Sequence, residues 1–343
     1  MRRILPLLAL VVAASIPLWI KDPYILNTFV TTGIFIIAAM SLNLLLGYTG
    51  QLSLGHVAFF GIGAYASALT SLGFDVTLFG KFHVVHEPWP VWTGLVMGVV
   101  VSGIFGYIVG KLSFRVRDAY FVIVTISFAE VVRLVALNWV ELTQGPLALT
   151  NIPPVAATIP GYGTFEFYSK TSYFYLVLAV LAVSYVIISR LVHSRTGRAM
   201  IALKQNESLA VSVGIDVTSY LVVAAVMSAG IAGAAGALYA HYLRIIDPDV
   251  FLFVYTVTMV IMVVTGGKGT LAGPLVGGLI FGFIPVISRS YVGPELQWII
   301  YGAFMILIVF VLPEGIVPAV EKWFAKNKKQ DVSASPAHVQ RAS

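Results

Sequence analysis

The sequence predicts an all-α fold, a polytopic bundle of transmembrane helices, and two observations predict it. Of the 343 residues, 59% are hydrophobic and only 10% are charged, whereas a soluble domain is about one quarter charged. Apolar runs of about 20 residues, the length that crosses a bilayer, recur along most of the chain. The chain contains no cysteine, which excludes disulfides, thiol catalysis and thiolate metal sites.

Ten apolar segments account for this pattern, and each is expected to cross the membrane once. In chain order they cover residues 4–20, 24–46, 51–72, 91–109, 119–137, 173–188, 220–242, 250–264, 274–288 and 296–312. The first resembles a signal peptide, because Arg2 and Arg3 precede an apolar run that contains small residues. We expect it to remain as a span, since the run continues to Ile20 and further spans follow at once.

The positions of the basic residues predict which side of the membrane each loop faces. With the N-terminus in the cytoplasm, fifteen of the 21 Lys and Arg residues lie on the cytoplasmic side, five lie outside, and Arg133 lies within a segment. Cytoplasmic loops carry an excess of Lys and Arg, so both termini are expected to be cytoplasmic. The same bias accounts for the net charge of +6 without a nucleic-acid partner.

Residues 1–326 are expected to form a single transmembrane domain, followed by a polar tail, residues 327–343, that we expect to be disordered. The external loops 73–90 and 138–172 are rich in proline, glycine and aromatic residues. The loop of residues 189–219 is the longest on the cytoplasmic side and carries most of the charge there.

The stretch from the second segment into the third combines weak helix formers with costly polar side chains. It contains five glycines: Gly47, Gly50, Gly55, Gly61 and Gly63. Each weakens a helix by about 1 kcal/mol relative to alanine. The polar residues Asn43, Gln51, Ser53 and His56 need partners that hydrocarbon does not supply. Tight helix packing is one explanation. We favour the other, a broken or re-entrant helix along a solute pathway that these polar groups line.

The fifth segment, within DAYFVIVTISFAEVVR (118–133), contains an ionisable pair. Glu130 and Arg133 are three residues apart and share a helix face. A charge at the bilayer centre costs about 2.5–3.5 kcal/mol, and mutual pairing reduces that cost. The pair either holds two helices together or forms a polar element beside the pathway. Thr125 of the same segment is a further candidate pathway residue.

Residues 265–270, TGGKGT, resemble a phosphate-binding loop only superficially. Gly269 follows Lys268 where Ser or Thr is required, and Met262 occupies the position of the first glycine. Any ATP is therefore expected to be hydrolysed by another chain. We expect Gly266, Gly267 and Gly269 to be helix-packing or broken-helix glycines. No HExxH pattern or cluster of His, Asp and Glu predicts a metal site.

The cytoplasmic stretch TGRAMIALKQNESLAVSVGID (196–216) has an amphipathic helical pattern. Arg198, Lys204 and Glu207 alternate with apolar residues, and Gly214 is a suitable terminator. A helix of this mixed character does not span a membrane. It lies on the membrane surface or docks in a groove of a partner.

Four blocks in the same order resemble the membrane permease subunits of branched-chain amino acid ABC importers, specifically the M-type subunit. They are SLNLLLGYTGQLSLGHVAFFGIGAY (41–65), DAYFVIVTISFAEVVR (118–133), NESLAVSVGI (206–215) and TGGKGTLAGPLVGG (265–278). The resemblance covers roughly residues 30–315. It implies a multi-pass protein of a bacterial or archaeal cell (inner) membrane.

By that resemblance, the loop around Glu207, Ala210 and Gly214 looks like the coupling helix that docks into an ATPase subunit. Leu209 stands where the family usually has alanine, and Gln144 and Ala148 of LTQGPLALTNIPP (142–154) replace small residues. The implied partners are a second, homologous permease subunit, two ATP-binding subunits and an extracytoplasmic solute-binding protein. ATP and Mg²⁺ would be bound by the partner subunits, so this chain is expected to hold no cofactor and to be no enzyme.

The resemblance leaves the solute open, because such permeases also carry urea, short amides and other amino or carboxylic acids. A single-chain secondary transporter driven by protons, with Glu130 as the carrier, is the rival class. Arg133 counts against it, because a neighbouring cation favours the charged carboxylate. A receptor or structural role ranks third.

Overall fold

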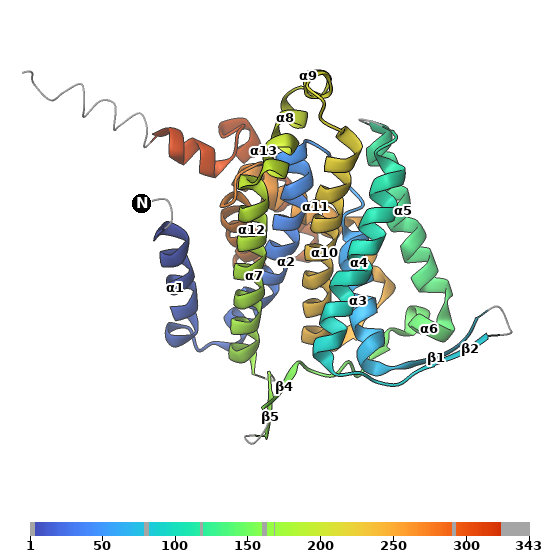
Figure 1. The fold of residues 1–343 in the computed structure, drawn as a ribbon. Helices are drawn as coiled ribbons and strands as arrows, with labels where there is room; N and C mark the ends of the chain where they lie inside the picture. Colours follow the sequence, from blue (N-terminus) through green and yellow to red (C-terminus); the bar gives the residue numbers. More distant parts are fainter. Residues whose placement is uncertain are drawn as a thin grey trace, which may run out of the picture.

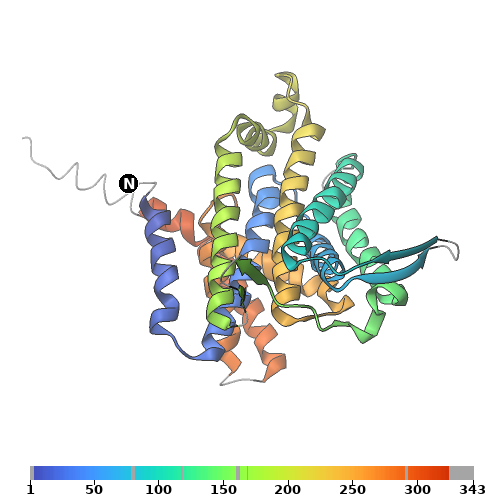
Figure 2. The same cartoon turned by 60° about the horizontal axis from the view of Figure 1, so that its bottom comes forward.

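The computed structural model describes residues 4–78, 82–116, 119–159, 163–167, 169–289 and 293–323. The predicted polar tail lies outside the described residues. The chain is mostly helical, and its long helices run side by side in one bundle (Figure 1). Two short helices, α8 (Arg195–Gln205) and α9 (Glu207–Ser212), lie at one end, the "α8–α9 end". Two β-hairpins lie at the opposite end, the "hairpin end" (Figures 1 and 2).

A helix lies in each of the ten predicted segments. They are α1 (Ile4–Trp19), α2 (Pro23–Asn43), α3 (Val57–Leu72), α4 (Val91–Ser113), α5 (Ala119–Asn138), α7 (Lys170–His193), α10 (Val217–Leu243), α11 (Phe253–Gly266), α12 (Gly273–Arg289) and α13 (Pro294–Val311). Among the described residues, five helices are long and apolar enough to cross a membrane: α2 with the turn that follows it, α4, α5, α7 and α10. The single crossing of all ten segments therefore stays a prediction.

The all-α prediction missed three small antiparallel sheets. Strand β1 (Phe74–Leu78) pairs with β2 (Phe82–His86), and β4 (Ala156–Ile159) pairs with β5 (Gly163–Glu166). Strands β3 (Leu149–Thr150) and β6 (Ile245–Ile246) join the segment after α5 to the end of α10. That segment also contains α6 (Val140–Thr143) and the 3₁₀ turn η2 (Gly145–Leu147). Backbone pairing of this kind satisfies N–H and C=O groups in loops whose glycines and prolines prevent helix formation.

The start of the third segment differs from the prediction. Helix α2 continues as a π-helix, η1 (Leu44–Thr49), and Gly50 then adopts a left-handed conformation with φ of 79°. Residues 51–56 are not helical, so α3 begins only at Val57. Glycine adopts positive φ at no steric cost, which explains the break at this position. The predicted broken helix is thus present in the chain, but the prediction of a helix over residues 51–56 was wrong.

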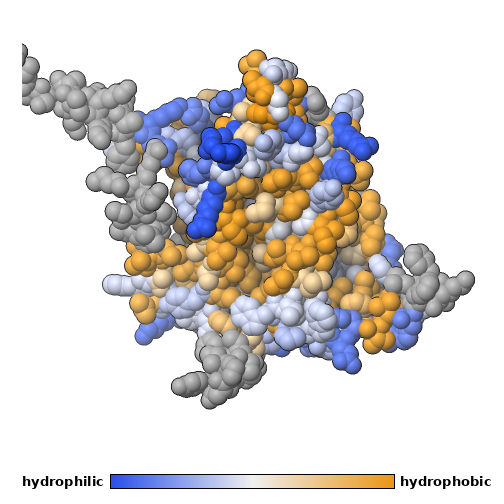
Figure 3. All heavy atoms as spheres, viewed as in Figure 1, coloured by the Kyte–Doolittle hydropathy of each residue, from blue (hydrophilic) through white to orange (hydrophobic). Residues whose placement is uncertain are grey.

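Helix α10 lies in the middle of the bundle, packed against α2, α3 and α4. Its inner surface consists largely of alanine and glycine, which let helices approach closely where no water is available to drive association. Gly233 contacts the backbone at Gly63, and Gly236 contacts the backbone at Phe60. The most hydrophobic 18 residues of α10 are 78% buried, against 22% for those of α5. The apolar face of the outer helices appears as the orange band in Figure 3.

Helices α3 and α11 are each too short to cross the bilayer alone. With 16 and 14 residues, they extend about 24 and 21 Å, less than the roughly 30 Å of hydrocarbon. Their first turns meet inside the bundle, where the Val57 N–H donates to Thr256 Oγ1 over 3.1 Å. The 3₁₀ turn η3 (Pro248–Phe251) leads into α11 and packs against both α3 and α5. The chain therefore contains two half-helices whose N-termini adjoin.

Candidate functional site

A polar junction joins α2 to the loop between α11 and α12 at the α8–α9 end. The Asn43 side-chain amide donates to the Thr270 carbonyl over 2.8 Å, and its Oδ1 accepts from the Gly269 N–H at 2.9 Å. Gly47 lies against this pair, because a Cβ there would collide with Asn43 and with the Gly269 backbone. Gly269 itself has a φ of 79°, which favours glycine. The predicted site residues Asn43, Gly47 and Gly269 thus lie in contact with one another in this junction.

Lys204 connects α8 to the same junction. Its ammonium group donates to the Gly47 carbonyl over 2.5 Å, an oxygen in the last turn of η1 where carbonyls lack partners within the helix. Burial, and secondarily the charge of Lys268, lower the pKa of Lys204 from its ordinary value. The sequence placed Lys204 on an amphipathic helix but contained no signal for its partner, which is 157 residues away. This hydrogen bond links α8 directly to η1, which continues α2.

The remaining predicted residues of the cytoplasmic loop lie at the outer end of the molecule. Ser194 and Asn206 cap α8 and α9, and Glu207 opens α9. Ala210 is buried, while Gly214 has a φ of 85° with nothing within 4 Å of an added Cβ. The guanidinium of Arg198 donates to the His193 carbonyl over 3.2 Å. Three apolar side chains project into solvent, at exposed fractions of 65%, 52% and 76%, and form the "α9 tip" (Figure 3): Leu209, Val211 and Val213.

The predicted polar pathway residues around the break are only partly satisfied inside the protein, because the buried Nδ1 of His56 and the buried Oγ of Ser53 have no hydrogen-bond partner among the described residues. His56 is fully buried, and its Nε2 lies 2.8 Å from the Ser41 hydroxyl. The Ser41 carbonyl in turn accepts from the Ser228 hydroxyl of α10 over 2.5 Å. Ser53 is also buried, whereas Gln51 is partly exposed. The Ser41 and Ser228 contacts fit the packing explanation, whereas the unpartnered atoms of His56 and Ser53 are not accounted for by packing. A role in solute passage stays a prediction.

The predicted glycines mark close approaches of backbones and rings. A Cβ at Gly55 would overlap the Thr125 carbonyl of α5, and one at Gly61 would overlap the Phe251 ring of η3. Gly63 faces Gly233, as noted above. In the loop after α11, a Cβ at Gly266 would collide with the Gly273 backbone, and Gly267 has a φ of 122°. Gly55, Gly63 and Gly266 meet backbone atoms and Gly267 has a positive φ, so these four positions require glycine more strictly than Gly61, which meets a side chain.

The ionisable pair on α5 lies on the outside of this chain. Arg133 donates to both carboxylate oxygens of Glu130, with N···O distances of 2.7–3.1 Å. The Glu130 side chain is 51% exposed and that of Arg133 is 23% exposed. Thr125 is buried on the opposite face and donates to the Val122 carbonyl over 2.9 Å. The structure therefore separates Thr125 from the pair and separates the pair from the Asn43 junction.

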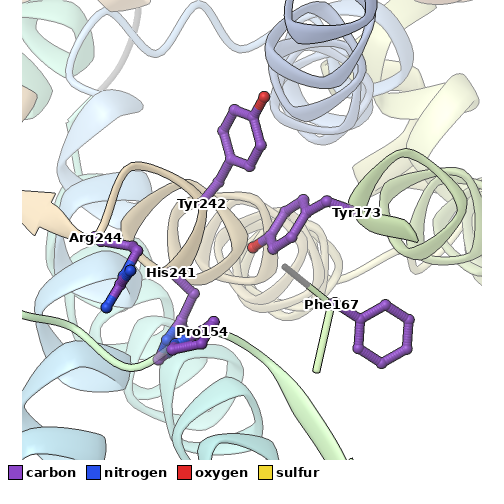
Figure 4. A pocket seen from close by; sticks show the side chains of 6 residues that line it. All are labelled: Pro154, Phe167, Tyr173, His241, Tyr242 and Arg244. Atoms are coloured by element: carbon purple, nitrogen blue, oxygen red, sulfur yellow. The ribbon is translucent and has the colours of Figure 1, made fainter. Parts of the chain in front are cut away.

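A pocket at the hairpin end was not foreseen from the sequence. Its lining residues, shown in Figure 4, are Pro154, Phe167, Tyr173, His241, Tyr242 and Arg244. The polar groups at its walls bind the protein itself, since His241 contacts the Pro153 carbonyl and the Ser67 hydroxyl, and Tyr173 donates to the Leu238 carbonyl. The contacts tie residues 152–154 to α10. None of the predicted pathway residues lines this pocket.

The stretch after α5 holds three non-glycine residues at positive φ: Gln144, Ala148 and Asn151. Ala148 is the most strained, with φ of 63° and ψ of 148°, a region that only glycine occupies readily. We expect Ala148→Gly to stabilise the protein by about 1–3 kcal/mol. Thermal unfolding in detergent measures this, with Ala136→Gly in the regular backbone of α5 as the control, which should destabilise by about 1 kcal/mol. Equal shifts of both variants would contradict the strained geometry.

Within the described residues, no group of three or more His, Cys, Asp or Glu side chains lies close enough to hold a metal ion.

Comparison with known proteins gives consistent matches. Residues 24–309 match the family model described as branched-chain amino acid transport system / permease component. The high-affinity branched-chain amino acid transport system permease protein LivM of Salmonella typhimurium is 31% identical over 311 residues, covering 84% of this chain and 68% of that protein. LivM of Escherichia coli is 30% identical with the same coverage, and LivH of S. typhimurium is 26% identical over 84% of this chain and 93% of its own. No solved structure matches.

Proposed function

Because the chain belongs to the family of permease components of branched-chain amino acid transport systems, we propose that it is the M-type transmembrane subunit of an ABC importer for leucine, isoleucine and valine. The names of the LivM relatives support the substrate class. The five long apolar helices support a multi-pass protein. The membrane is the cell (inner) membrane of a bacterium or archaeon.

The α8–α9 end faces the cytoplasm in this proposal, with both termini on that side. The excess of Lys and Arg in the loops that the sequence assigns to this side supports the orientation. The hairpin end then faces outward, toward an extracytoplasmic binding protein. A second, homologous permease subunit completes the membrane part, and two partner subunits bind ATP and Mg²⁺. This chain itself is not an enzyme.

The observation that carries the mechanism is the connection from the α9 tip to α2. The α9 tip exposes three apolar side chains, Leu209, Val211 and Val213, that are suited to bind in a groove on a partner. Behind them, Lys204 holds the Gly47 carbonyl, and Asn43 holds the loop between α11 and α12. Closure of the ATP-binding subunits would pull α8 and α9, and this chain of contacts would tilt α2 and α11 together.

A proton-driven secondary transporter with Glu130 as the carrier is the weaker alternative. Glu130 accepts three hydrogen-bond contacts from Arg133, and pairing of this kind favours the ionised carboxylate over the protonated form that a proton carrier must adopt.

Uptake of radiolabelled leucine into vesicles that contain this chain and its neighbouring subunits tests the function. We expect uptake to require internal ATP and a loaded binding protein, and to persist when the proton gradient is collapsed. Uptake by this chain alone, driven by the gradient, would overturn the proposal. ATP hydrolysis stimulated only by a different loaded binding protein would keep the ABC mechanism and reassign the solute.

The coupling role of α9 is tested in the same vesicles by Glu207→Arg. A reversed charge in the first turn of α9 repels the helix N-terminus and the docking surface, so we expect uptake to fall by at least about tenfold. The matched control is Glu321→Arg, an exposed carboxylate in the segment after α13, which should leave uptake unchanged. Equal uptake by both variants would exclude Glu207 from coupling.

A further inference from the structure

One face of α5 carries polar and charged side chains where a membrane helix is expected to meet lipid. Ser127, Glu130 and Arg133 follow one another at intervals of three residues, and Ser127 and Glu130 are exposed. Apolar side chains flank them, notably Val131 and Leu134 at exposed fractions of 55% and 44%. A helix surface that carries both charged and apolar side chains is not expected to face only lipid.

The charged residues lie near the middle of α5 and not at either of its ends. Glu130 is the twelfth of the 20 residues of α5, so it lies roughly 16 Å along a helix about 30 Å long. Its neighbour Ala129 packs with Val57 and Ala58, the first residues of the half-helix α3. The exposed carboxylate is therefore at the level where the two half-helices meet.

The turn η3 adds a further charge to this surface. Asp249 is exposed and attracts the Arg133 guanidinium, and η3 packs directly against α5. Arg133 thus forms its ion pair with Glu130 on its own helix, while Asp249, on the turn that precedes α11, is a second negative charge that acts on it without a direct contact. Neither carboxylate is enclosed by this chain, which leaves each able to exchange partners.

Contact with hydrocarbon is energetically unfavourable for the charged side chains of Glu130 and Arg133. Each charge at the bilayer centre costs about 2.5–3.5 kcal/mol on insertion scales, and the pair is too far from either end of α5 for Glu130 to reach water by its short side chain. Contact with water or with another polar molecule removes this cost. This surface therefore requires water or a polar partner beside it within the membrane.

We propose that Ser127, Glu130 and Arg133 of α5, with Asp249 of η3, bind the zwitterionic main chain of an amino acid during its passage through the membrane. The proposal rests on the function proposed above. The α-ammonium group takes the place of Arg133 on Glu130, with Asp249 as a second nearby negative charge, and the α-carboxylate takes the bidentate position on Arg133. The substrate brings one charge of each sign, so the net charge of the site does not change. Val131 and Leu134 receive the apolar side chain.

Water access to the α5 face is tested by cysteine labelling, which is straightforward because the chain has no cysteine of its own. Ser127→Cys is compared with Val100→Cys, on an apolar exposed face of α4. The assembled complex in lipid vesicles is treated with a charged, membrane-impermeant thiosulfonate, and the mass of this chain is measured. Because only a thiol in contact with water forms the reactive thiolate, we expect labelling at position 127 to be at least about tenfold faster than at position 100. Equal rates would overturn the proposal.

Substrate contact is tested by removing both charges together in Glu130→Leu/Arg133→Leu, which leaves neither charge unpaired. A structural pair replaced by apolar side chains of similar size is often neutral or stabilising, so in that case uptake would be retained and the proposal would be wrong. We expect instead that the complex assembles, that the loaded binding protein still stimulates ATP hydrolysis, and that leucine uptake falls at least about tenfold.

The two tests separate this proposal from the proposed function. If the unaltered complex takes up no leucine, the assigned substrate fails, while the difference in labelling between positions 127 and 100 is unaffected. If leucine uptake is normal but leucine does not slow labelling of Ser127→Cys, the proposed binding site on α5 is wrong, whereas the proposed importer function is retained. Slower labelling with loaded binding protein and ATP is the result that supports both.

Discussion

Gly55→Leu should prevent the helix bundle from assembling. A Cβ at this position overlaps the backbone carbonyl of Thr125 on α5, and a backbone atom cannot move aside by changing a rotamer. Overpacking typically costs about 1–3 kcal/mol, and a backbone clash exceeds that range. We expect little monodisperse protein in detergent, and a lowered thermal unfolding midpoint in whatever is recovered. Gly55→Ala should already show part of the loss.

Two comparisons make this result specific. Gly302 lies in α13 with nothing within 4 Å of an added Cβ, so Gly302→Leu should assemble like the unaltered chain. Gly61→Leu meets the ring of Phe251, a side chain that can shift, and its effect should lie between the other two. A Gly55→Leu protein as stable as Gly302→Leu would mean that residues 50–56 do not pack against α5.

Lys204→Met should separate ATP hydrolysis from transport. Methionine keeps the length of the side chain but removes the hydrogen bond to the Gly47 carbonyl. A hydrogen bond from a charged group contributes about 1.5 kcal/mol or more, which corresponds to roughly a tenfold change in an equilibrium. In reconstituted vesicles we expect leucine uptake to fall about tenfold while the loaded binding protein still stimulates ATP hydrolysis.

Lys268→Met is the matched control, because Lys268 is exposed at the same end and influences Lys204 by its charge. Its removal takes away a repulsion that lowers the pKa of Lys204, and so favours the charged ammonium form that donates to Gly47. Uptake should therefore be unchanged or slightly higher. A loss of uptake as large in Lys268→Met as in Lys204→Met would show that positive charge at this end, and not the bond to Gly47, is what transport requires.

The helices could be located from the sequence because the information that defines them is local. Apolar runs identify all ten, while the capping residues that fix several helix starts in the structure were not used in the prediction. Asp22, Ser169 and Asp216 each accept a backbone N–H at the start of α2, α7 and α10. The glycines between residues 47 and 63 indicated a broken helix. They did not indicate that the break extends over residues 51–56, since glycine is compatible with both helical and non-helical backbone.

The half-helix α11 could not be derived in the same way. Its segment was predicted to begin at residue 250, but η3 occupies residues 248–251 and the helix starts at Phe253. The turn is stabilised by Phe251, which packs against Gly61 and stacks on the ring of Tyr65. Contacts between segments almost 200 residues apart leave no signal in local hydropathy.

The candidate site was found in part, for a physical reason. Asn43, His56 and the pair of Glu130 and Arg133 stood out because polar groups in an apolar segment need partners. Which partners they have depends on the fold, so the bonds of Asn43 to residues 269 and 270 and of Lys204 to Gly47 were not foreseen. Their roles in transport stay predictions until the variants are measured.

The meeting of the two half-helices sets an order for biosynthesis. Val57 leaves the ribosome 199 residues before Thr256, which accepts its backbone N–H in the finished protein. At 5–20 residues per second this interval lasts about 10–40 s. Until then the start of α3 has no side-chain acceptor at this depth, and hydrocarbon offers none. The hydrogen bond that joins the third segment to the eighth can therefore form only after the eighth segment has been synthesised.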